Sequence, residues 1–207
     1  MSASIASDTC IILLGAGSSR RYGDKKLLQL LDGKHLFRHA LLESVRSICM
    51  QVVFVVDKDL KRIIRDEMQD YGGRVMFAVN REPEKGLSSS IAAGMKKLPR
   101  CGAVLLLAAD QPLVSSALLN RIILKHAGDR EKIVAACVNG EARNPALFPS
   151  SCFSELLKLK GDKGAKVLMN AHRENVVCIA TDADELMDVD TMQDLELARE
   201  LYRRAKQ

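Results

Sequence analysis

The chain has 207 residues, of which 47% are hydrophobic and 28% are charged, and its formal net charge is +5. This balance excludes intrinsic disorder, a collagen-like chain and a bare coiled coil, and the length favours one domain over residues 1–207. No apolar run approaches the roughly 20 residues of a membrane span. Aromatic residues make up only 4% and Trp is absent, so stacking platforms for bases are scarce. We therefore expect no membrane and no nucleic-acid partner, while the mild positive charge favours small anionic ligands.

The cysteines predict a reduced protein. They are widely spread, with no C-x-x-C pair, and most lie inside apolar runs where a thiol packs as a small hydrophobic group. The six are Cys10, Cys49, Cys101, Cys137, Cys152 and Cys178. Such dispersion in a chain of this length argues against a disulfide framework. The N-terminal region lacks a basic segment, and its apolar stretch at 10–14 is too short for a signal peptide, so we expect a cytoplasmic location.

Apolar runs rich in Val, Ile and Leu alternate with segments of helical period. The strands expected in chain order are 10–14, 52–56, 74–79, 103–109, 133–138 and 176–180, with a short one at 146–148. The helices expected between and after them are 35–48, 59–70, 88–97, 116–126, 151–158 and 191–203. Because the strands are almost continuously hydrophobic, both faces of the sheet must be covered. The sequence therefore predicts a three-layer α/β/α sandwich with a mostly parallel, Rossmann-like sheet.

Hydroxyl residues stand where three of these helices begin: Ser116, Ser151 and Thr191 are each able to cap free amide donors. The long irregular stretches are 15–25, 80–87 and 139–144. The first two follow strands directly. In an open α/β sheet, ligands bind beyond the carboxyl ends of the strands, so these two loops should line the binding crevice.

The first loop combines small residues with cations. It reads LGAGSSRRYGDKK over 14–26. The small residues allow a ligand to approach the backbone amides, and the four cations at Arg20, Arg21, Lys25 and Lys26 suit a polyphosphate. The alternative is a glycine turn followed by a solvated basic stretch. A P-loop would need G-x-x-x-x-G-K-[ST], and the dinucleotide fingerprint would need a third glycine where Arg20 stands, so both familiar motifs fail.

The loop resembles the sequence pattern of the MobA-like nucleotidyltransferases, L-A-A-G-x-S-x-R-M/F-G-x-x-K. The matching positions are Leu14, Ala16, Gly17, Ser19, Arg21, Gly23 and Lys26, and Tyr22 takes the aromatic option. Gly15 departs from the pattern, which usually has Ala there. The resemblance continues through NREPEKGLSSSIAAG at 80–94, AADQPLV at 108–114, PALF at 145–148, GDKGAK at 161–166 and DVDT at 188–191. It covers residues 10 to about 199, and the second half is similar to the cytidylyltransferases of molybdenum cofactor.

The resemblance implies transfer of a nucleotidyl group to a phosphorylated acceptor, with release of pyrophosphate. It implies that Arg21 binds the β- and γ-phosphates and that Lys26 lies near the α-phosphate. Asp110 is the implied ligand of Mg²⁺, with Asp190 or Asp188 as the second carboxylate. The nucleotide-binding residues so implied are Leu14, Gly15, Ala16, Gly17, Ser19, Arg21, Lys26, Asn80, Gly86 and Ser90. Those placed near the acceptor are Arg143, Asn144, Pro145 and Phe148.

Each assignment has a plainer alternative. The alternative for Asp110 is the start of a turn with Pro112, and the alternative for the acids at 188 and 190 is a helix cap beside Thr191. His35 and His39 are four residues apart on an amphipathic helix, and with no third ligand nearby we expect a surface pair. The GDKGAK stretch is expected to be a capped turn and helix start rather than a second phosphate loop.

The resemblance thus favours a Mg²⁺-dependent transferase that uses CTP rather than GTP and acts on a molybdopterin-type acceptor. Residues 1–110 would bind the nucleotide and 111–207 the acceptor, and a molybdoenzyme apoprotein is a further partner that it allows. One alternative is a nucleotidyltransferase for a sugar phosphate or methylerythritol phosphate. Another is a non-catalytic, nucleotide-binding maturation factor for a molybdenum hydroxylase. A dinucleotide oxidoreductase is disfavoured because the fingerprint fails.

Overall fold

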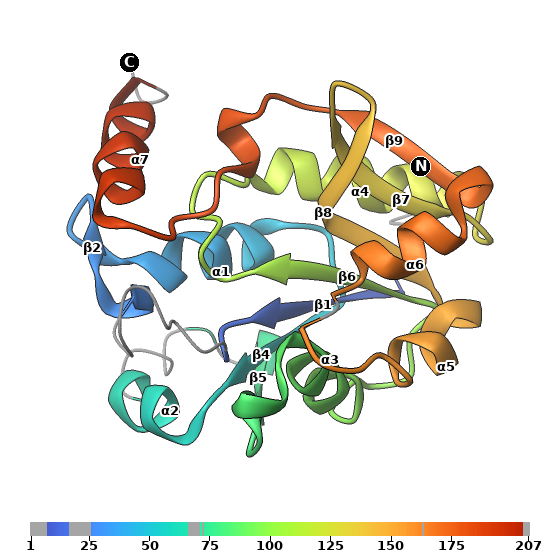
Figure 1. Ribbon diagram of the computed structural model, residues 1–207, viewed down its shortest axis with the longest axis horizontal. Coiled ribbons are helices and arrows are strands. Elements are labelled where there is room, and N and C mark those ends of the chain that lie inside the picture. The colour runs from blue at the N-terminus through green and yellow to red at the C-terminus, as the bar shows by residue number, and fades with distance from the viewer. Residues whose placement is uncertain (1–7, 17–25, 66–70, 72, 163, 205–207) are drawn as a thin grey trace, which may run out of the picture.

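A seven-stranded sheet forms the centre of the computed structural model, which describes residues 8–16, 26–65, 71, 73–162 and 164–204 (Figure 1). The strand order is β5-β4-β1-β6-β8-β7-β9. The strands are β1 (Thr9–Leu14), β4 (Gln51–Val56), β5 (Val75–Val79), β6 (Ala103–Ala108), β7 (Ile133–Val138), β8 (Glu141–Pro149) and β9 (Val176–Ala180). Strand β8 runs antiparallel to both of its neighbours, and the other pairings are parallel. The mostly parallel sheet is confirmed.

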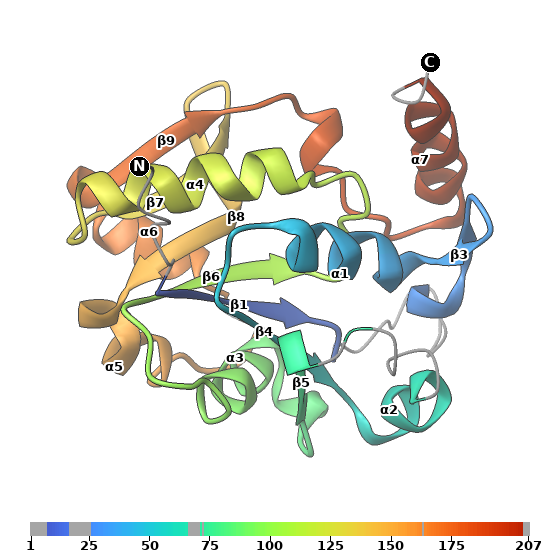
Figure 2. The same cartoon turned by 180° about the vertical axis from the view of Figure 1, so that it is seen from behind.

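Helices cover both faces of the sheet. They are α1 (Leu36–Arg46), α2 (Lys58–Ile64), α3 (Leu87–Met95), α4 (Ser116–Gly128), α5 (Phe153–Leu156), α6 (Lys166–Ala171) and α7 (Met192–Arg204). Helices α1 and α4 lie on one face, and α3, α5 and α6 lie on the other (Figures 1 and 2). The three-layer α/β/α prediction is therefore confirmed. None of the helices in the described part of the chain has the length and apolarity needed to cross a membrane.

The two faces of β1 explain why its sequence is hydrophobic throughout. Ile11 and Leu13 belong to the core on the α1 and α4 side, while Ile12 and Leu14 belong to the core under α3. Successive side chains of a strand point to opposite faces, so a strand covered on both sides needs apolar residues at every position. Helix α3 packs closely here because it has glycine at Gly94, where a Cβ would lie 2.7 Å from Ile12 Cγ2.

The helix starts agree in part with the predicted caps. Thr191 caps α7: its hydroxyl accepts from the Asp194 amide, and the Asp194 carboxylate accepts from the Thr191 amide at 2.7 Å. The cap of α4 is Ser115 rather than Ser116, one residue earlier than expected. Ser151 lies in a 3₁₀ turn that precedes α5, and no side-chain cap is recorded there. The predicted cap at Ser151 is therefore wrong.

The sequence predicts an irregular stretch at residues 139–144, but the structure forms a β-hairpin there. Asn139 and Gly140 have φ of 52° and 81°, and β8 begins at Glu141. Asn-Gly is the preferred pair for a two-residue hairpin turn because both central positions need positive φ. The strand predicted at 146–148 therefore extends back to the turn.

The prediction of fully reduced cysteines is also wrong. Cys137 of β7 and Cys178 of β9 form a disulfide. The register pairs Cys137 with Ala180 and Ala135 with Cys178, so the two cysteines are diagonal neighbours on parallel strands. Cys10, Cys49, Cys101 and Cys152 are free.

Helix α7 packs on the hairpin of β2 (Leu30–Leu31) and β3 (Lys34–His35) through a third apolar cluster (Figure 2). Its buried members are Leu31, Leu36, Val189, Leu195 and Ala198. His39 is buried beside this cluster, with Nε2 2.8 Å from the Leu31 carbonyl oxygen and its ring edge against Tyr202. The expected surface pair of histidines is therefore wrong, because α7 covers His39.

Candidate active site

The start of the first loop, at residues 14–16, and the loop after β6 lie side by side at the carboxyl edge of the sheet. Strand β1 lies between β4 and β6, and Leu14 pairs with Ala108. The Ala109 amide donates to the Leu14 carbonyl oxygen at 2.9 Å, so Asp110 follows directly. From β1 the chain goes to β4 and β5 on one side and returns to β6 on the other, which makes this the switch point of the sheet. In such sheets the switch point is where ligands bind.

Lys26 joins two acids that are far apart in the sequence. Its Nζ donates to Asp110 Oδ2 at 2.6 Å and to Asp190 Oδ1 at 2.9 Å. Lys26 is 8% exposed, so it is nearly buried between them. Burial alone would lower the pKa of Lys26, but the charge and hydrogen bond of Asp110, followed by those of Asp190, outweigh it and raise the pKa. Lys26 is therefore a fully charged ammonium that bridges two carboxylates.

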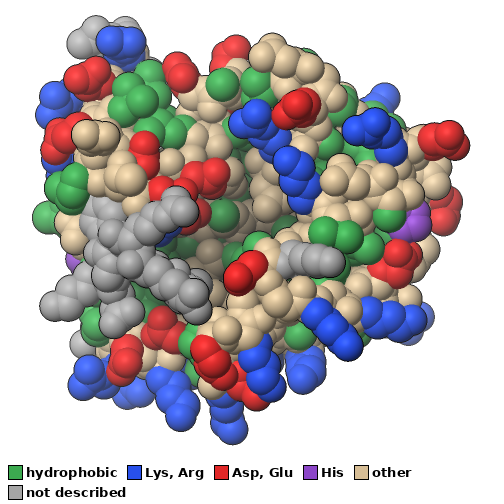
Figure 3. All heavy atoms as spheres, viewed as in Figure 1, with side chains coloured by type: hydrophobic (Ala, Val, Ile, Leu, Met, Phe, Trp, Pro, Cys, Tyr) green, Lys and Arg blue, Asp and Glu red, His purple; other side chains and the backbone are tan. Residues whose placement is uncertain are grey.

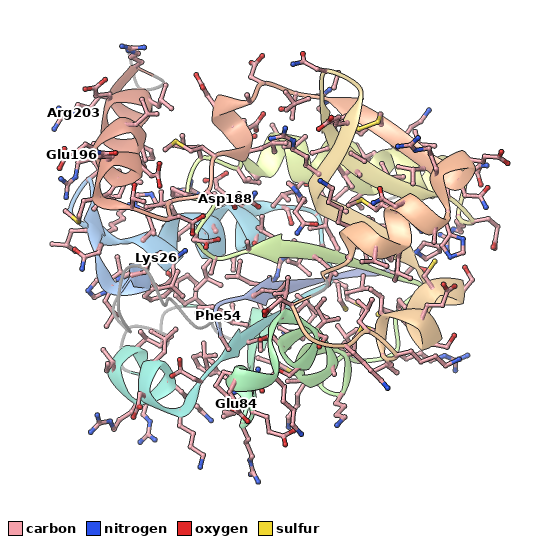
Figure 4. The ribbon with its side chains drawn as sticks, in the orientation of Figure 1. Lys26, Phe54, Glu84, Asp188, Glu196 and Arg203 are labelled. Carbon is pink, nitrogen blue, oxygen red and sulfur yellow. A yellow bond between two sulfur atoms is a disulfide. The ribbon has the colours of Figure 1, made fainter. Side chains whose placement is uncertain are left out.

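Asp188 completes the acidic group. Figure 4 shows it near Lys26, in the region between α7 and the sheet. The residue is exposed to solvent, yet partial burial and then the negative charges of Asp110 and Asp190 together raise the pKa of Asp188 to about 6, against the opposing charge of Lys26. Three carboxylates thus repel one another around a single ammonium, which indicates a site built for additional positive charge.

Backbone contacts hold the two acidic segments together. The Val189 amide donates to the Asp110 carbonyl oxygen at 3.0 Å. Gln111 is 4% exposed, and its Nε2 donates to the Leu186 carbonyl oxygen at 3.2 Å. The Oε1 of Gln111 is buried without a hydrogen-bond partner in the described part of the chain. Gln111 was not predicted from the sequence, where its only signal is its place directly after Asp110.

The start of the first loop is pressed against the core. The Gly15 amide donates to the Val55 carbonyl oxygen at 2.8 Å. A Cβ on Gly15 would lie 2.5 Å from Cε2 of Phe54, which is fully buried. The family pattern usually has alanine at position 15, but in this chain the Phe54 ring leaves no room for a Cβ, which explains the glycine. The predicted site residues Gly17, Ser19 and Arg21 lie outside the described residues.

The second loop, residues 80–87, and the start of α3 contact the beginning of the first loop. Ser90 is fully buried, and its hydroxyl donates to the Ala16 carbonyl oxygen at 2.5 Å. Asn80 is also buried, and its Nδ2 donates to Ser90 Oγ at 3.0 Å and to Ser89 Oγ at 2.8 Å. These side chains connect the loop after β5 to the loop after β1, so their contacts in this structure are structural.

Gly86 lies against the GDKGAK stretch. It has φ of 85°, and a Cβ there would lie 2.6 Å from the Gly161 carbonyl carbon and 2.4 Å from Asp162 Oδ1. The Ser88 amide donates to the Gly161 carbonyl oxygen at 3.1 Å. Among the described residues of the stretch, 161–162 form a turn that borders the second loop and helix α6 begins at Lys166, as predicted, but the predicted cap is wrong because no side chain caps the helix.

The four residues expected near the acceptor differ in access. Arg143 is exposed, with its guanidinium 3.6 Å from Glu141 Oε2. Asn144 precedes Pro145 through a cis peptide bond at an irregularity of the β7–β8 ladder. Phe148 is fully buried and packs in the core under α3. Contact of Phe148 with an acceptor is therefore not possible in this structure, because the side chain has no exposed surface.

The acidic group fits a hard divalent cation by the chemistry of its donors. Mg²⁺ prefers carboxylate and phosphate oxygens, and the Lys26 ammonium already bridges two carboxylates as a cation. Among the described residues, no group of three or more His, Cys, Asp or Glu side chains is arranged so that it could hold a metal ion by itself. Figure 3 shows Asp and Glu side chains at the edge of a hollow on this face. The acids therefore suit a metal that arrives with phosphate oxygens rather than a preassembled protein cage.

The structure also contains a cavity of about 1150 Å³. It is lined by parts of α1 and α7 and by residues 112–115 and 182–185. None of the site residues predicted from sequence lines it, so it is separate from the acidic group.

Comparisons with known proteins show the family of the chain. The family model of the MobA-like NTP transferase domain matches residues 11–176. A purine catabolism protein, PucB of Bacillus subtilis, is 30% identical over 197 residues, which are 91% of this chain and 94% of that protein.

Solved structures share the fold. The crystal structure of Rv0371c from Mycobacterium tuberculosis H37Rv is 26% identical with a TM-score of 0.76, covering 93% of this chain and 96% of that one. Its complex with manganese has a TM-score of 0.73 at 24% identity, covering 93% and 97%. Molybdopterin-guanine dinucleotide biosynthesis protein A from Archaeoglobus fulgidus has a TM-score of 0.68 at 19% identity, covering 95% and 99%. At these lower identities the likeness is one of fold.

Proposed function

The chain belongs to the MobA-like NTP transferase family, and from that premise we propose that it transfers a nucleotidyl group from CTP to a molybdopterin-type acceptor, with Mg²⁺ and with release of pyrophosphate. The observation that carries the proposal is the meeting of Lys26, Asp110 and Asp190 at the switch point of the sheet. A transferase of this kind must bring two anions together, so a site with both a buried cation and carboxylates for a metal is what the chemistry needs.

The first loop binds the triphosphate in this proposal. Its amides and Arg21 contact the β- and γ-phosphates, which leave as pyrophosphate. Lys26 stabilises the negative charge that develops on the α-phosphate during attack by the acceptor. Asn80 and Ser90 fix the loop through Ala16, while Gly86 allows the second loop to pack directly against residues 161–162.

Asp110 would hold the metal together with Asp188 or Asp190. When bound there, Mg²⁺ would supply positive charge beside the phosphates. The manganese complex of Rv0371c, a related fold, supports a divalent cation in general, and Mg²⁺ is the proposed one. The helix-cap alternative for these acids does not apply to Asp190, whose carboxylate is directed to Lys26, because Asp194 and Thr191 cap α7.

Residues 1–110 carry the nucleotide in this proposal, and residues 111–207 carry the acceptor. The acceptor lies toward Arg143, Asn144 and Pro145, near the beginning of β8, beside the carboxyl edge of the sheet. Asn144 supports this place, because its Oδ1 is buried without a partner in the described structure. The preference for CTP and the molybdopterin class rest on the sequence resemblance, and a molybdoenzyme apoprotein would receive the product. We propose a cytoplasmic location, where nucleoside triphosphates occur.

A pyrophosphate-release assay tests the proposal. The purified protein is given Mg²⁺, molybdopterin and either CTP or GTP. We expect release that is faster with CTP. Replacing Lys26 by Ala should slow turnover about 10²–10³-fold, as for the loss of one preorganised donor. The matched control is Lys97→Ala, an exposed lysine at the end of α3, which should behave as the wild type.

The other outcomes decide among the alternatives. Equal or faster release with GTP would overturn the choice of donor. Release only with a sugar phosphate or methylerythritol phosphate would replace the acceptor class. No release with any of these acceptors and triphosphates would favour the non-catalytic maturation factor.

A further inference from the structure

The Lys26 ammonium occupies the place between Asp110 and Asp190 where a metal bound to both carboxylates would lie. The Lys26 ammonium contacts Asp110 Oδ2 at 2.6 Å and Asp190 Oδ1 at 2.9 Å. Asp110 follows strand β6, and Asp190 precedes helix α7. A divalent cation bound to the same two oxygens would lie close to the position of Nζ, since metal–oxygen distances are about 2.0–2.1 Å for Mg²⁺. Lys26 and a metal therefore compete for the same carboxylate oxygens.

Two cations at this spacing repel each other. At a few ångströms inside a partly buried site, the repulsion between an ammonium and a divalent ion is not screened as it is in water. Lys26 is 8% exposed, so its charge is held inside the site. As long as Lys26 bridges the two acids, a metal alone should bind them weakly.

A nucleoside triphosphate would change this balance because it brings new anionic oxygens for the ammonium. Lysine carries a compact charge on a flexible stem of four carbons, so Nζ can change partners without a change of fold. Movement of Nζ from the carboxylates to the phosphates frees Asp110 and Asp190 at the moment when a metal can bind both the acids and the phosphates.

We propose that Lys26 is a placeholder for the metal: its ammonium bridges Asp110 and Asp190 until a triphosphate draws it away, so that metal and triphosphate bind strongly only together. This inference rests on the proposed function, since it assumes that the acids hold the metal of that reaction. It assigns Lys26 a role in the order of binding, in addition to its role on the α-phosphate.

Mn²⁺ binding without nucleotide tests the inference without any turnover. The free Mn²⁺ signal in electron paramagnetic resonance gives the affinity of the wild type and of Lys26→Met, which keeps an unbranched side chain but removes the charge. We expect Lys26→Met to bind Mn²⁺ at least about tenfold more tightly than the wild type, because the competing cation is gone. Lys97→Met, at an exposed lysine, is the matched control and should bind as the wild type does.

A second arm begins with the wild type, whose response to CTP does not depend on how a variant folds. Adding CTP should raise the Mn²⁺ affinity of the wild type by about tenfold or more, as Lys26 leaves the acids. In Lys26→Met the same addition should have a smaller effect. Asp110→Asn in the Lys26→Met protein should remove the gain, which would locate the metal at these acids.

Unchanged or weaker Mn²⁺ binding by folded Lys26→Met would overturn the inference, as would wild-type affinity that is the same with and without CTP. Failure of the proposed function is seen separately. If pyrophosphate is not released with any acceptor while Lys26→Met still gains Mn²⁺ affinity, then the exchange of cations stands and the reaction does not.

Discussion

Gly15 shows how a single residue connects the loop to the core. Its neighbour Phe54 is fully buried and stacks between Phe37 and Phe77, with ring centroids 5.6 Å and 6.1 Å away. The Phe54 ring therefore has little room to move. A side chain at position 15 would have to displace it, although the family pattern usually places alanine there.

We predict that Gly15→Ala lowers the free energy of unfolding by about 1–3 kcal/mol, the usual cost of overpacking a core. Denaturant unfolding checks this, with Gly73→Ala as control, since a Cβ on Gly73 meets nothing within 4 Å. Adding Phe54→Leu should relieve the clash, so the double variant should be more stable than the sum of the single losses predicts. Additive losses, or a Gly15→Ala protein as stable as the wild type, would show that Phe54 does not restrict this position.

At the scale of elements, β9 is the end strand of the sheet and pairs with β7. The disulfide between Cys137 and Cys178 adds a covalent connection between these strands, across 41 residues of sequence. Cys178 is exposed, so a reductant can reach the bond. A crosslink of this kind stabilises mainly by restricting the unfolded chain.

Reduction should therefore lower the free energy of unfolding by about 2–4 kcal/mol. Thermal or denaturant unfolding with and without dithiothreitol measures the effect. The control is the double variant Cys137→Ser with Cys178→Ser, which should unfold identically in both conditions. A wild type that is insensitive to the reductant would contradict the expected contribution of the crosslink.

The third apolar cluster is the element that positions the charged residues. Leu27 follows Lys26, Val189 lies between Asp188 and Asp190, and both pack against α7. The segment after the first loop and the segment before α7 are thus held by one small core. This explains why a lysine and an aspartate 164 residues apart meet.

At the scale of the whole molecule, local pattern predicted the layers well and the contacts between distant segments poorly. The apolar runs predicted six of the sheet's strands within about two residues at either end, since a strand covered on both faces must be hydrophobic throughout. The hairpin at Asn139 and Gly140 was readable from the Asn-Gly pair and was missed. Burial of His39 depends on α7, which no local pattern reveals.

The residues that meet at the candidate site were named from the sequence, but the contacts between them were not. Lys26 and Asp110 were singled out by resemblance to a family pattern, yet their direct contact spans 84 residues and follows from the order of strands β1 and β6. The disulfide was missed for the same reason, because the pairing of β7 with β9 is a property of the sheet. Gln111 had no pattern of its own.

The most direct measurement is the anomalous scattering of Mn²⁺ in a crystal of the protein soaked with CTP and Mn²⁺. The account predicts a single strong peak in contact with Asp110 and with Asp188 or Asp190, with the triphosphate along residues 14–26 and the Lys26 ammonium on a phosphate. A triphosphate bound away from that loop, or Lys26 still bridging the two acids with the metal elsewhere, would contradict it.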